Sequence, residues 1–204
     1  MEAFPLIVIS APSGTGKTTM VRHLLALEPR LAFTISHTTR APRKGEVHGR
    51  DYYFVRRAEF ESMIRRHAFL EWAEVHGALY GTGWEELERI RSQGKIPVLD
   101  IDVQGAAQVQ RKAPQGLFIM LIPPDWHTLE HRLRERGDLD SAEIDRRVQR
   151  AREEVQYWWM YDHVVVNDDL DTTMDMVHSI VKGYLTSVQV YRMRGESPVR
   201  ALFS

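Results

Sequence analysis

The chain has 204 residues, 27 of them Lys or Arg and 28 Asp or Glu, so its formal net charge is −1. A near-neutral chain lacks the basic surface that non-specific nucleic-acid binding requires, and we expect no nucleic-acid partner. Cysteine is absent, which excludes disulfides, thiol catalysis and cysteine-ligated zinc. The N-terminus has no basic region and no apolar run approaches about 18 residues, so we expect a cytoplasmic protein without signal peptide or membrane span.

Short apolar segments alternate with helix-like segments along most of the chain. The predicted strands cover residues 5–10, 32–37, 96–101, 117–122 and 163–167. The predicted helices cover residues 17–27, 104–111, 125–136, 143–158 and 170–186. Near-continuous apolar strands separated by helices indicate a parallel sheet covered on both faces, so the predicted fold class is α/β.

Residues from about 40 to 83 break this alternation. They contain the apolar segment YYFV at 52–55, a short helical segment at 58–67 and the alternating sequence FLEWAEV at 69–75. Alternation favours antiparallel strands with one solvated face, so we interpret this region as an inserted small mixed α/β subdomain. Residues 137–142 separate two charged helices and are predicted to form the tip of a helical lid. The predicted organisation is one domain, with its core at about 1–38 and 95–190, the insertion at about 39–94 and the lid at about 132–147.

A phosphate-binding loop follows the first predicted strand. The loop consists of Ala11, Pro12, Ser13, Gly14, Thr15, Gly16, Lys17 and Thr18. It matches the P-loop pattern except that Ala replaces the first Gly. Its small residues allow successive backbone N–H groups to face phosphate oxygens, Lys17 can reach the β- and γ-phosphates, and Thr18 can ligate Mg²⁺. The predicted sheet is therefore of the P-loop NTPase type.

Two carboxylates end the predicted strand at 96–101. Asp100 and Asp102 share one face because side chains in a strand alternate, and ligands of parallel sheets gather at this edge. A buried carboxylate needs a partner, so we expect Mg²⁺ or a polar group of the substrate there. The alternative for Asp102 is that it caps the helix that begins near Gln104.

Several basic and hydroxyl side chains are candidates for handling a second phosphate group. Ser36, Arg40 and Arg43 offer a hydroxyl and two guanidinium groups suited to a monophosphate. Tyr52 and Tyr80 add phenolic donors. Near the predicted lid, further cations could close over a triphosphate, although each could equally be a solvated surface residue: Arg132, Arg136, Arg146 and Arg147.

From the first predicted strand to about Asp171, the chain resembles the guanylate kinase family. The resemblance rests on the APSG-x-GK loop, on Ser36 followed by HTTR-x-PR at 37–43, and on GE-V-x-G-x-DY-x-F at 45–54. It continues through F-x-EWA at 69–73, YG at 80–81, LDIDxQG at 99–105 and VNDD at 166–169. This combination is much more specific than the phosphate loop alone.

The resemblance implies Mg²⁺-dependent phosphoryl transfer from ATP to GMP, giving ADP and GDP. It assigns residues to four groups: Ser36, Arg40, Arg43, Tyr52 and Tyr80 to the GMP phosphate; Glu71, Thr82 and Asp100 to guanine; Arg132, Arg136 and Arg147, with Lys17, to catalysis; and Asn167 to the adenine pocket. Thr18 and Asp102 are the expected metal contacts. A carboxylate at Glu71 can accept hydrogen bonds from the N1–H and the 2-amino group of guanine, and adenine has neither donor. His37 and Thr82 depart from the family pattern, in which Ser is common at both places.

Other interpretations remain open from the sequence. A related P-loop kinase acting on a ribose bisphosphate would not need Glu71 and Thr82 as guanine contacts. A non-catalytic guanylate-kinase-like interaction module typically has a degraded phosphate loop, whereas this chain keeps Lys17 and Thr18. The H-x-x-E-H pattern at 127–131 has the form of a zinc motif, but no separate helix with an acidic ligand is evident. We expect the aromatic segment at 157–160 to pack under the lid helix, and the oligomeric state is left undetermined.

Overall fold

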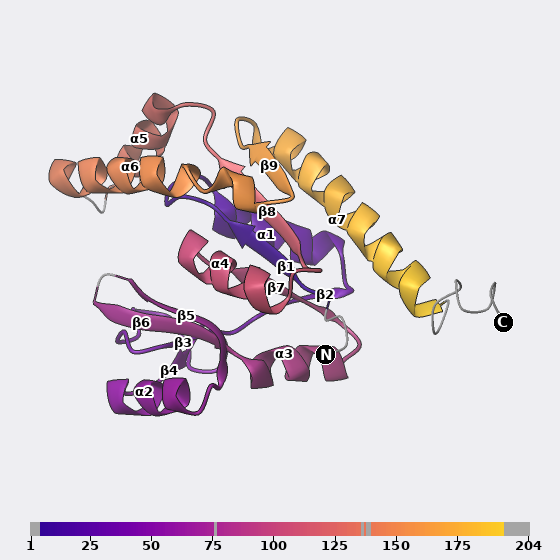
Figure 1. The fold of residues 1–204 in the computed structure, drawn as a ribbon. Helices are drawn as coiled ribbons and strands as arrows, with labels where there is room; N and C mark the ends of the chain where they lie inside the picture. Colours follow the sequence, from indigo (N-terminus) through magenta and orange to yellow (C-terminus); the bar gives the residue numbers. More distant parts are fainter. Residues whose placement is uncertain (1–4, 76, 136, 138–139, 194–204) are drawn as a thin grey trace.

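A parallel five-stranded sheet forms the larger part of the molecule (Figure 1). The computed structural model describes residues 5–75, 77–135, 137 and 140–193. The strands lie in the order β2–β7–β1–β8–β9, with bounds Leu31–Phe33, Ile96–Asp100, Ile7–Ser10, Leu117–Ile122 and His163–Val166. All four residues of the central strand β1 are buried, as expected for a strand covered on both faces. The predicted α/β class with a parallel sheet is confirmed.

Helices cover both faces of this sheet. They are α1, α7, α3 and α4, with bounds Lys17–Leu27, Leu170–Met193, Trp84–Ser92 and Val103–Lys112. Ile7 and Ile9 point into the apolar cluster that contains residues of α1 and α7. Leu6 and Val8 point into the cluster that contains residues of α3 and α4. Because side chains of a strand alternate between faces, β1 contributes to both halves of the core.

A second, smaller sheet lies beside the first and has four strands. Its order is β4–β3–β6–β5, with bounds Tyr53–Phe54, His37–Thr38, Ala78–Gly83 and Phe69–Val75. β3 pairs parallel with β4 and antiparallel with β6, so the sheet is mixed. Phe60 of α2 (Arg57–Arg65) packs with Phe69 and Leu79 in a separate small core. The predicted small mixed α/β unit is confirmed.

Two helices, α5 (Trp126–Glu135) and α6 (Ser141–Val155), pack against each other beside the five-stranded sheet (Figure 1). Leu129 and Leu133 of α5 meet Ile144 of α6 in their shared cluster. Among the described residues, no helix is both long and apolar enough to cross a membrane.

The strand predicted over 32–37 is wrong in extent, because two strands of different sheets occupy that stretch. β2 ends at Phe33, and the N–H and hydroxyl of Thr34 both donate to the carbonyl of Val98. The chain then crosses to the smaller sheet, where His37–Thr38 form β3. The sequence at 32–37 therefore runs from one sheet to the other, and no local pattern in these six residues marks where the first strand ends.

Helix ends also differ from the predictions. α6 stops at Val155, because the N–H groups of Gln156 and Tyr157 donate to carbonyls three residues back, and a short 3₁₀ helix follows at Trp158–Met160. α7 continues to Met193, and helix α3 was not predicted. The expected packing of the aromatic segment under the lid helix is wrong for its two tryptophans, since Trp158 is 57% and Trp159 67% exposed.

Candidate active site

The phosphate-binding loop bends tightly between β1 and α1. Gly14 and Gly16 have φ angles of 91° and 93°, in the left-handed region that favours glycine. A Cβ at Gly16 would lie 2.8 Å from Nδ2 of Asn167, so that position has no room for a side chain. The loop therefore needs glycine at Gly16 both for its backbone conformation and for its contact with the end of β9.

Asn167, which directly follows β9, is hydrogen-bonded to the phosphate loop. Its side chain is buried and donates a hydrogen bond to the carbonyl of Thr15. The backbone carbonyl of Asn167 accepts a hydrogen bond of 2.9 Å from Nη1 of Arg132. Nη2 of Arg132 donates to the backbone carbonyl of Asp168, also at 2.9 Å. In this conformation the Asn167 amide is therefore engaged with a carbonyl of the phosphate loop, and the Arg132 guanidinium with two carbonyls just after β9.

The two aspartates at the C-terminal end of β7, Asp100 within the strand and Asp102 just after it, have different partners. Asp100 forms an ion pair with Lys17. Oδ1 of Asp102 accepts hydrogen bonds from the N–H groups of Gln104 (3.0 Å) and Gly105 (2.9 Å), so Asp102 does cap helix α4. Its Oδ2 is buried and, within the described ranges, has no hydrogen-bond partner; Nη2 of Arg150 lies 3.7 Å away. One carboxylate oxygen of Asp102 thus lies at the site without a hydrogen bond in the described residues, but within ion-pair distance of Arg150.

Glu71 of β5 is a buried carboxylate at the other side of the site, only 4% exposed. Its Oε1 accepts a hydrogen bond of 2.8 Å from the N–H of Thr82. The hydroxyl of Thr82 lies 3.1 Å from that of Ser36, and Thr82 is fully buried. The pKa of Glu71 is raised from 4.5 to about 7, chiefly by burial and also by the charge of Asp102, although the Thr82 hydrogen bonds and the charge of Lys112 act in the opposite direction.

One pocket of about 420 Å³ joins the phosphate loop to the Glu71 side of the molecule. Fourteen of the predicted site residues line it: Ala11, Pro12, Ser13, Gly14, Gly16, Lys17, Thr18, Ser36, Tyr52, Glu71, Tyr80, Asp100, Asp102 and Arg147. The phosphate loop and the buried carboxylate come from separate sheets, and the fold places them around the same space. A site with a phosphate cradle at one end and a hydrogen-bonding carboxylate at the other can hold two substrates together.

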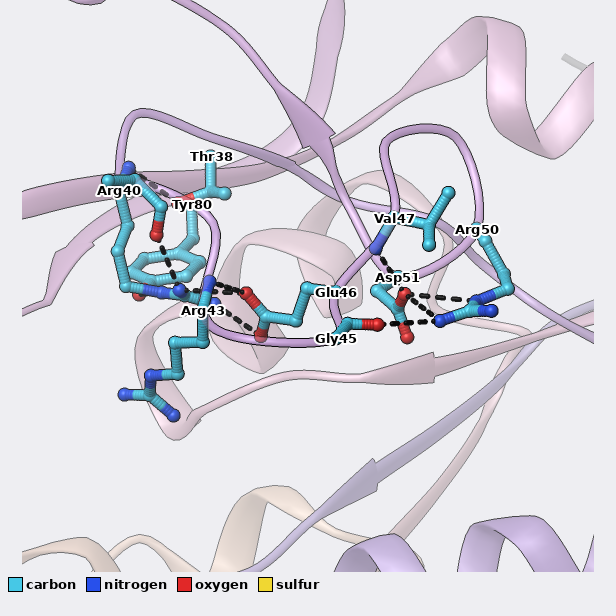
Figure 2. Close-up of polar contacts among 10 residues, drawn as sticks. Thr38, Arg40, Arg43, Gly45, Glu46, Val47, Arg50, Asp51 and Tyr80 are labelled. Carbon is cyan, nitrogen blue, oxygen red and sulfur yellow. Dashed lines mark hydrogen bonds and ion pairs between the residues drawn. The ribbon is translucent and has the colours of Figure 1, made fainter.

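Arg40 is not among the residues that line this pocket, but it contacts Tyr52 and Tyr80, which do. It lies in the polar network shown in Figure 2. Its guanidinium donates to Glu46 through Nη1 (3.0 Å) and Nη2 (2.8 Å), to the carbonyl of Ala41 (2.7 Å) and, through Nε, to the hydroxyl of Tyr80 (3.2 Å). These bonds use four of the five N–H donors of a guanidinium. The guanidinium also lies 5.4 Å from the ring centre of Tyr52, so Arg40 is fixed in place before any ligand binds.

Glu46 is the residue of this network whose role the sequence did not suggest. Besides binding Arg40, it accepts a hydrogen bond of 2.6 Å from the backbone N–H of Arg43. The Arg43 guanidinium points away from Glu46 in Figure 2. The Gly-Glu pair at 45–46 in the family motif was the available indication that this position matters.

Helix α6 brings two arginines to the pocket. Arg147 pairs with Glu143 (2.9 Å) and its Nη1 lies 3.4 Å from the Ser13 hydroxyl, so it reaches the phosphate loop. Arg150, which was not among the predicted site residues, also lines the pocket and pairs with Glu154 at 2.9 Å. Arg136 lies outside the described residues.

Gly105 of α4 closes tightly on Glu71. A Cβ at this position would lie 2.8 Å from Oε2 of Glu71, whereas a Cβ at the helical Gly183 would meet nothing within 4 Å. Alanine at Gly183 should raise the free energy of unfolding by about 0.5–1 kcal/mol through helix propensity. Alanine at Gly105 should lose that gain because of overpacking, so the free energy of unfolding of this variant should be about 2 kcal/mol lower than that of the Gly183 variant. Urea unfolding followed by circular dichroism measures both; equal stabilisation by the two substitutions would contradict the tight fit.

The fold and the site define the class of protein. A parallel sheet whose first strand leads through a glycine-rich phosphate loop into a helix, with an acidic strand end beside it, is the architecture of P-loop nucleotide-binding proteins. The sequence model of the guanylate kinase family matches residues 4–184, and the chain belongs to this family.

Individual relatives agree with this assignment. A guanylate kinase from Methylococcus capsulatus is 45% identical over 184 residues, which cover 90% of each chain. Guanylate kinases from Neisseria gonorrhoeae and Geobacter metallireducens are 46% and 43% identical over 176 residues, covering 86% of this chain and 86% and 87% of theirs. The crystal structure of guanylate kinase from Anaplasma phagocytophilum superimposes with a TM-score of 0.71 at 31% identity, covering 89% of this chain and 86% of that one.

Proposed function

We propose that this protein transfers the terminal phosphoryl group of ATP to GMP, giving ADP and GDP. The observation that carries the proposal is that Lys17 and the buried carboxylate of Glu71 line the same pocket. Phosphoryl transfer depends on positioning and charge neutralisation, and a pocket that holds donor and acceptor together provides the first of these. The membership of the guanylate kinase family supports the same reaction.

The residues of the pocket divide between the two substrates. On the donor side, we assign the triphosphate of ATP to the loop at 11–18, with Lys17 and Arg147 neutralising charge on the transferred group. On the acceptor side, we assign the GMP phosphate to Arg40 and Arg43 with neighbouring hydroxyls, and guanine to Glu71. The insertion at about 39–94 then acts as the GMP-binding part, and the segment at about 132–147 as a lid that limits the access of water.

Mg²⁺ fits the donor set near the phosphate loop. Thr18 and Asp102 line the pocket, and Oδ2 of Asp102 is buried without a hydrogen-bond partner in the described part of the chain. Mg²⁺ usually takes only one or two protein ligands and completes its shell with phosphate oxygens and water, so these two residues are sufficient. Bound there with ATP, the ion would neutralise and orient the phosphates. No group of three or more His, Asp or Glu in the described ranges is placed to hold a metal ion.

A panel of nucleoside monophosphates tests the proposal. ADP formation from ATP and Mg²⁺ is measured with GMP, AMP, CMP and UMP at equal concentrations. We expect turnover with GMP to exceed that with AMP by at least about 10³-fold, because AMP would leave the buried Glu71 carboxylate without its partners. Equal turnover with GMP and AMP, or none with any of the four, would refute the proposed function.

The affinity for GMP should fall in acid. The pKa of Glu71 is about 7, so the carboxyl is ionised above this pH and protonated below it. Only the ionised form can accept both guanine hydrogen bonds, so KM for GMP should rise by about tenfold for each pH unit below 7. Initial rates at saturating ATP between pH 6 and 8 measure this. The GMP phosphate also titrates near pH 6, and the Glu71→Gln variant keeps that titration while losing the step near 7. An identical pH profile in the variant would show that Glu71 does not control the affinity.

A further inference from the structure

Strand β5 contains an irregularity immediately before Glu71. Phe69 pairs with Gly83 and Glu71 with Thr82, so two residues of β5 are passed for one residue of β6. Leu70 is the extra residue, which makes this position a β-bulge. Phe69 packs into the small core of the second sheet, whereas Leu70 packs into the main core on the α3–α4 face.

The bulge determines where Glu71 points. Side chains of a strand alternate, and an extra residue reverses the faces of everything on one side of it. Phe69, Leu70 and Glu71 are consequently all buried, and normal alternation resumes with Trp72 exposed and Ala73 buried. If the same residues paired regularly onward from Phe69, Leu70 would lie opposite Thr82, and Glu71 would lie opposite Gly81 on the face that Trp72 now has. The bulge therefore determines the direction in which the carboxylate proposed to bind guanine points.

Helix α4 holds this part of β5, with which it is in contact (Figure 1). Nζ of Lys112 donates to the carbonyl of Phe69 at 3.2 Å and also to the carbonyl of Leu70, the two carbonyls of the bulge. One turn earlier, the side-chain amide of Gln108 accepts from the N–H of Trp72 (3.2 Å) and donates to its carbonyl (2.7 Å).

The contacts of α4 bracket Glu71 on both sides along the strand. Gly105, Gln108 and Lys112 lie on one face of the helix, three and four residues apart, and meet β5 in succession. A bulge locally disrupts the ladder of backbone hydrogen bonds, and Lys112 supplies a donor to each of the two carbonyls at this bulge.

We propose that Lys112, with Gln108 as its helper, is a positioning residue for guanine recognition, because it holds the β-bulge at Leu70 that aims Glu71 into the pocket. This inference rests on the proposed function, since it concerns how the same carboxylate recognises GMP. Lys112 acts through Glu71 and does not itself touch the substrate.

The test compares GMP with inosine monophosphate, which keeps the N1–H of guanine and lacks the 2-amino group. Lys112→Met removes the two hydrogen bonds to the bulge, and Arg111→Met is the matched control on the adjacent position of the same helix. For Lys112→Met we expect KM for GMP to rise about tenfold, with KM for ATP within about twofold, which corresponds to one hydrogen bond to a charged group. The preference for GMP over inosine monophosphate should fall by a similar factor, and Lys112→Arg should restore most of it.

The wild type and the variants report on different claims. If the wild type does not phosphorylate GMP, the proposed function fails and this inference falls with it. If the wild type does so and a folded Lys112→Met keeps the wild-type preference and KM for GMP, the inference alone is overturned. If Lys112→Met raises KM for ATP as much as KM for GMP and also lowers kcat and the melting temperature, Lys112 has a merely structural role, and the inference is likewise overturned. If Lys112→Met does not fold, Gln108→Met, which removes only the contacts at Trp72, is measured in the same way and should lower the same preference about threefold.

Discussion

Replacing Glu71 with glutamine is expected to lower kcat/KM for GMP by about a hundredfold or more while KM for ATP stays within about twofold. The amide can accept one hydrogen bond from guanine, but its NH₂ group would face the second guanine donor. The site is buried, with Glu71 only 4% exposed, so water cannot compensate for the mismatched donors. Steady-state kinetics with each substrate varied in turn provide the measurement.

Glu74 offers a matched control for that substitution. It lies three residues further along β5, its side chain is 51% exposed, and it pairs with Arg57 at 3.6 Å. Glu74→Gln makes the same chemical change in the same strand and should leave kcat/KM for GMP within about twofold. The role of Glu71 would be contradicted by equal effects of the two substitutions, or by a Glu71→Gln variant that keeps wild-type turnover of GMP.

Replacing Lys17 with methionine is expected to lower kcat by about a thousandfold with little change in KM for GMP. Lys17 lines the pocket beside the phosphate loop, and a preorganised cation aimed at developing charge contributes on this scale. Methionine keeps the length of the side chain and removes the charge. We assign GMP to the opposite end of the pocket and to other residues, so its ground-state binding should survive.

The ion pair between Lys17 and Asp100 makes a stability control necessary. Without Lys17, Asp100 loses its partner, and the variant should melt at a somewhat lower temperature while remaining folded at 25 °C. Lys182→Met, at an exposed position of α7, is the matched substitution and should leave both kcat and the melting temperature unchanged. A folded Lys17→Met enzyme with kcat within tenfold of the wild type would exclude the assigned role.

Features that depend on adjacent residues could be predicted from the sequence. The phosphate loop is continuous from Ala11 to Thr18, and its glycines, lysine and threonine have the spacing that its chemistry requires. Buried parallel strands are recognisable because nearly all their residues are apolar. The choice of Glu71 as a guanine contact came from the family motif; the structure adds that it is buried and that it lines the pocket with Lys17.

Features that depend on distant partners could not be predicted in this way. The bulge at Leu70 exists because two cores and helix α4 meet there, and nothing in FLEWAEV marks an extra residue. In Asp102 one oxygen caps α4, and the other has no hydrogen bond in the described residues and lies 3.7 Å from Arg150; this arrangement depends on the positions of α4 and α6. The exposure of Trp158 and Trp159 was wrongly predicted because aromatic composition alone does not tell which surface a residue meets.

The contacts beneath the phosphate loop have a mechanical consequence for the proposed lid. Arg132 clamps α5 to the end of β9, and Asn167 joins that point to the loop itself. α5 is thus tied at Arg132 to the residues just after β9, and we expect any closure of the proposed lid that keeps these bonds to leave Arg132 in place. Because Asn167 contacts both Arg132 and the phosphate loop, we expect the base of the lid and the loop to keep a fixed relation to each other.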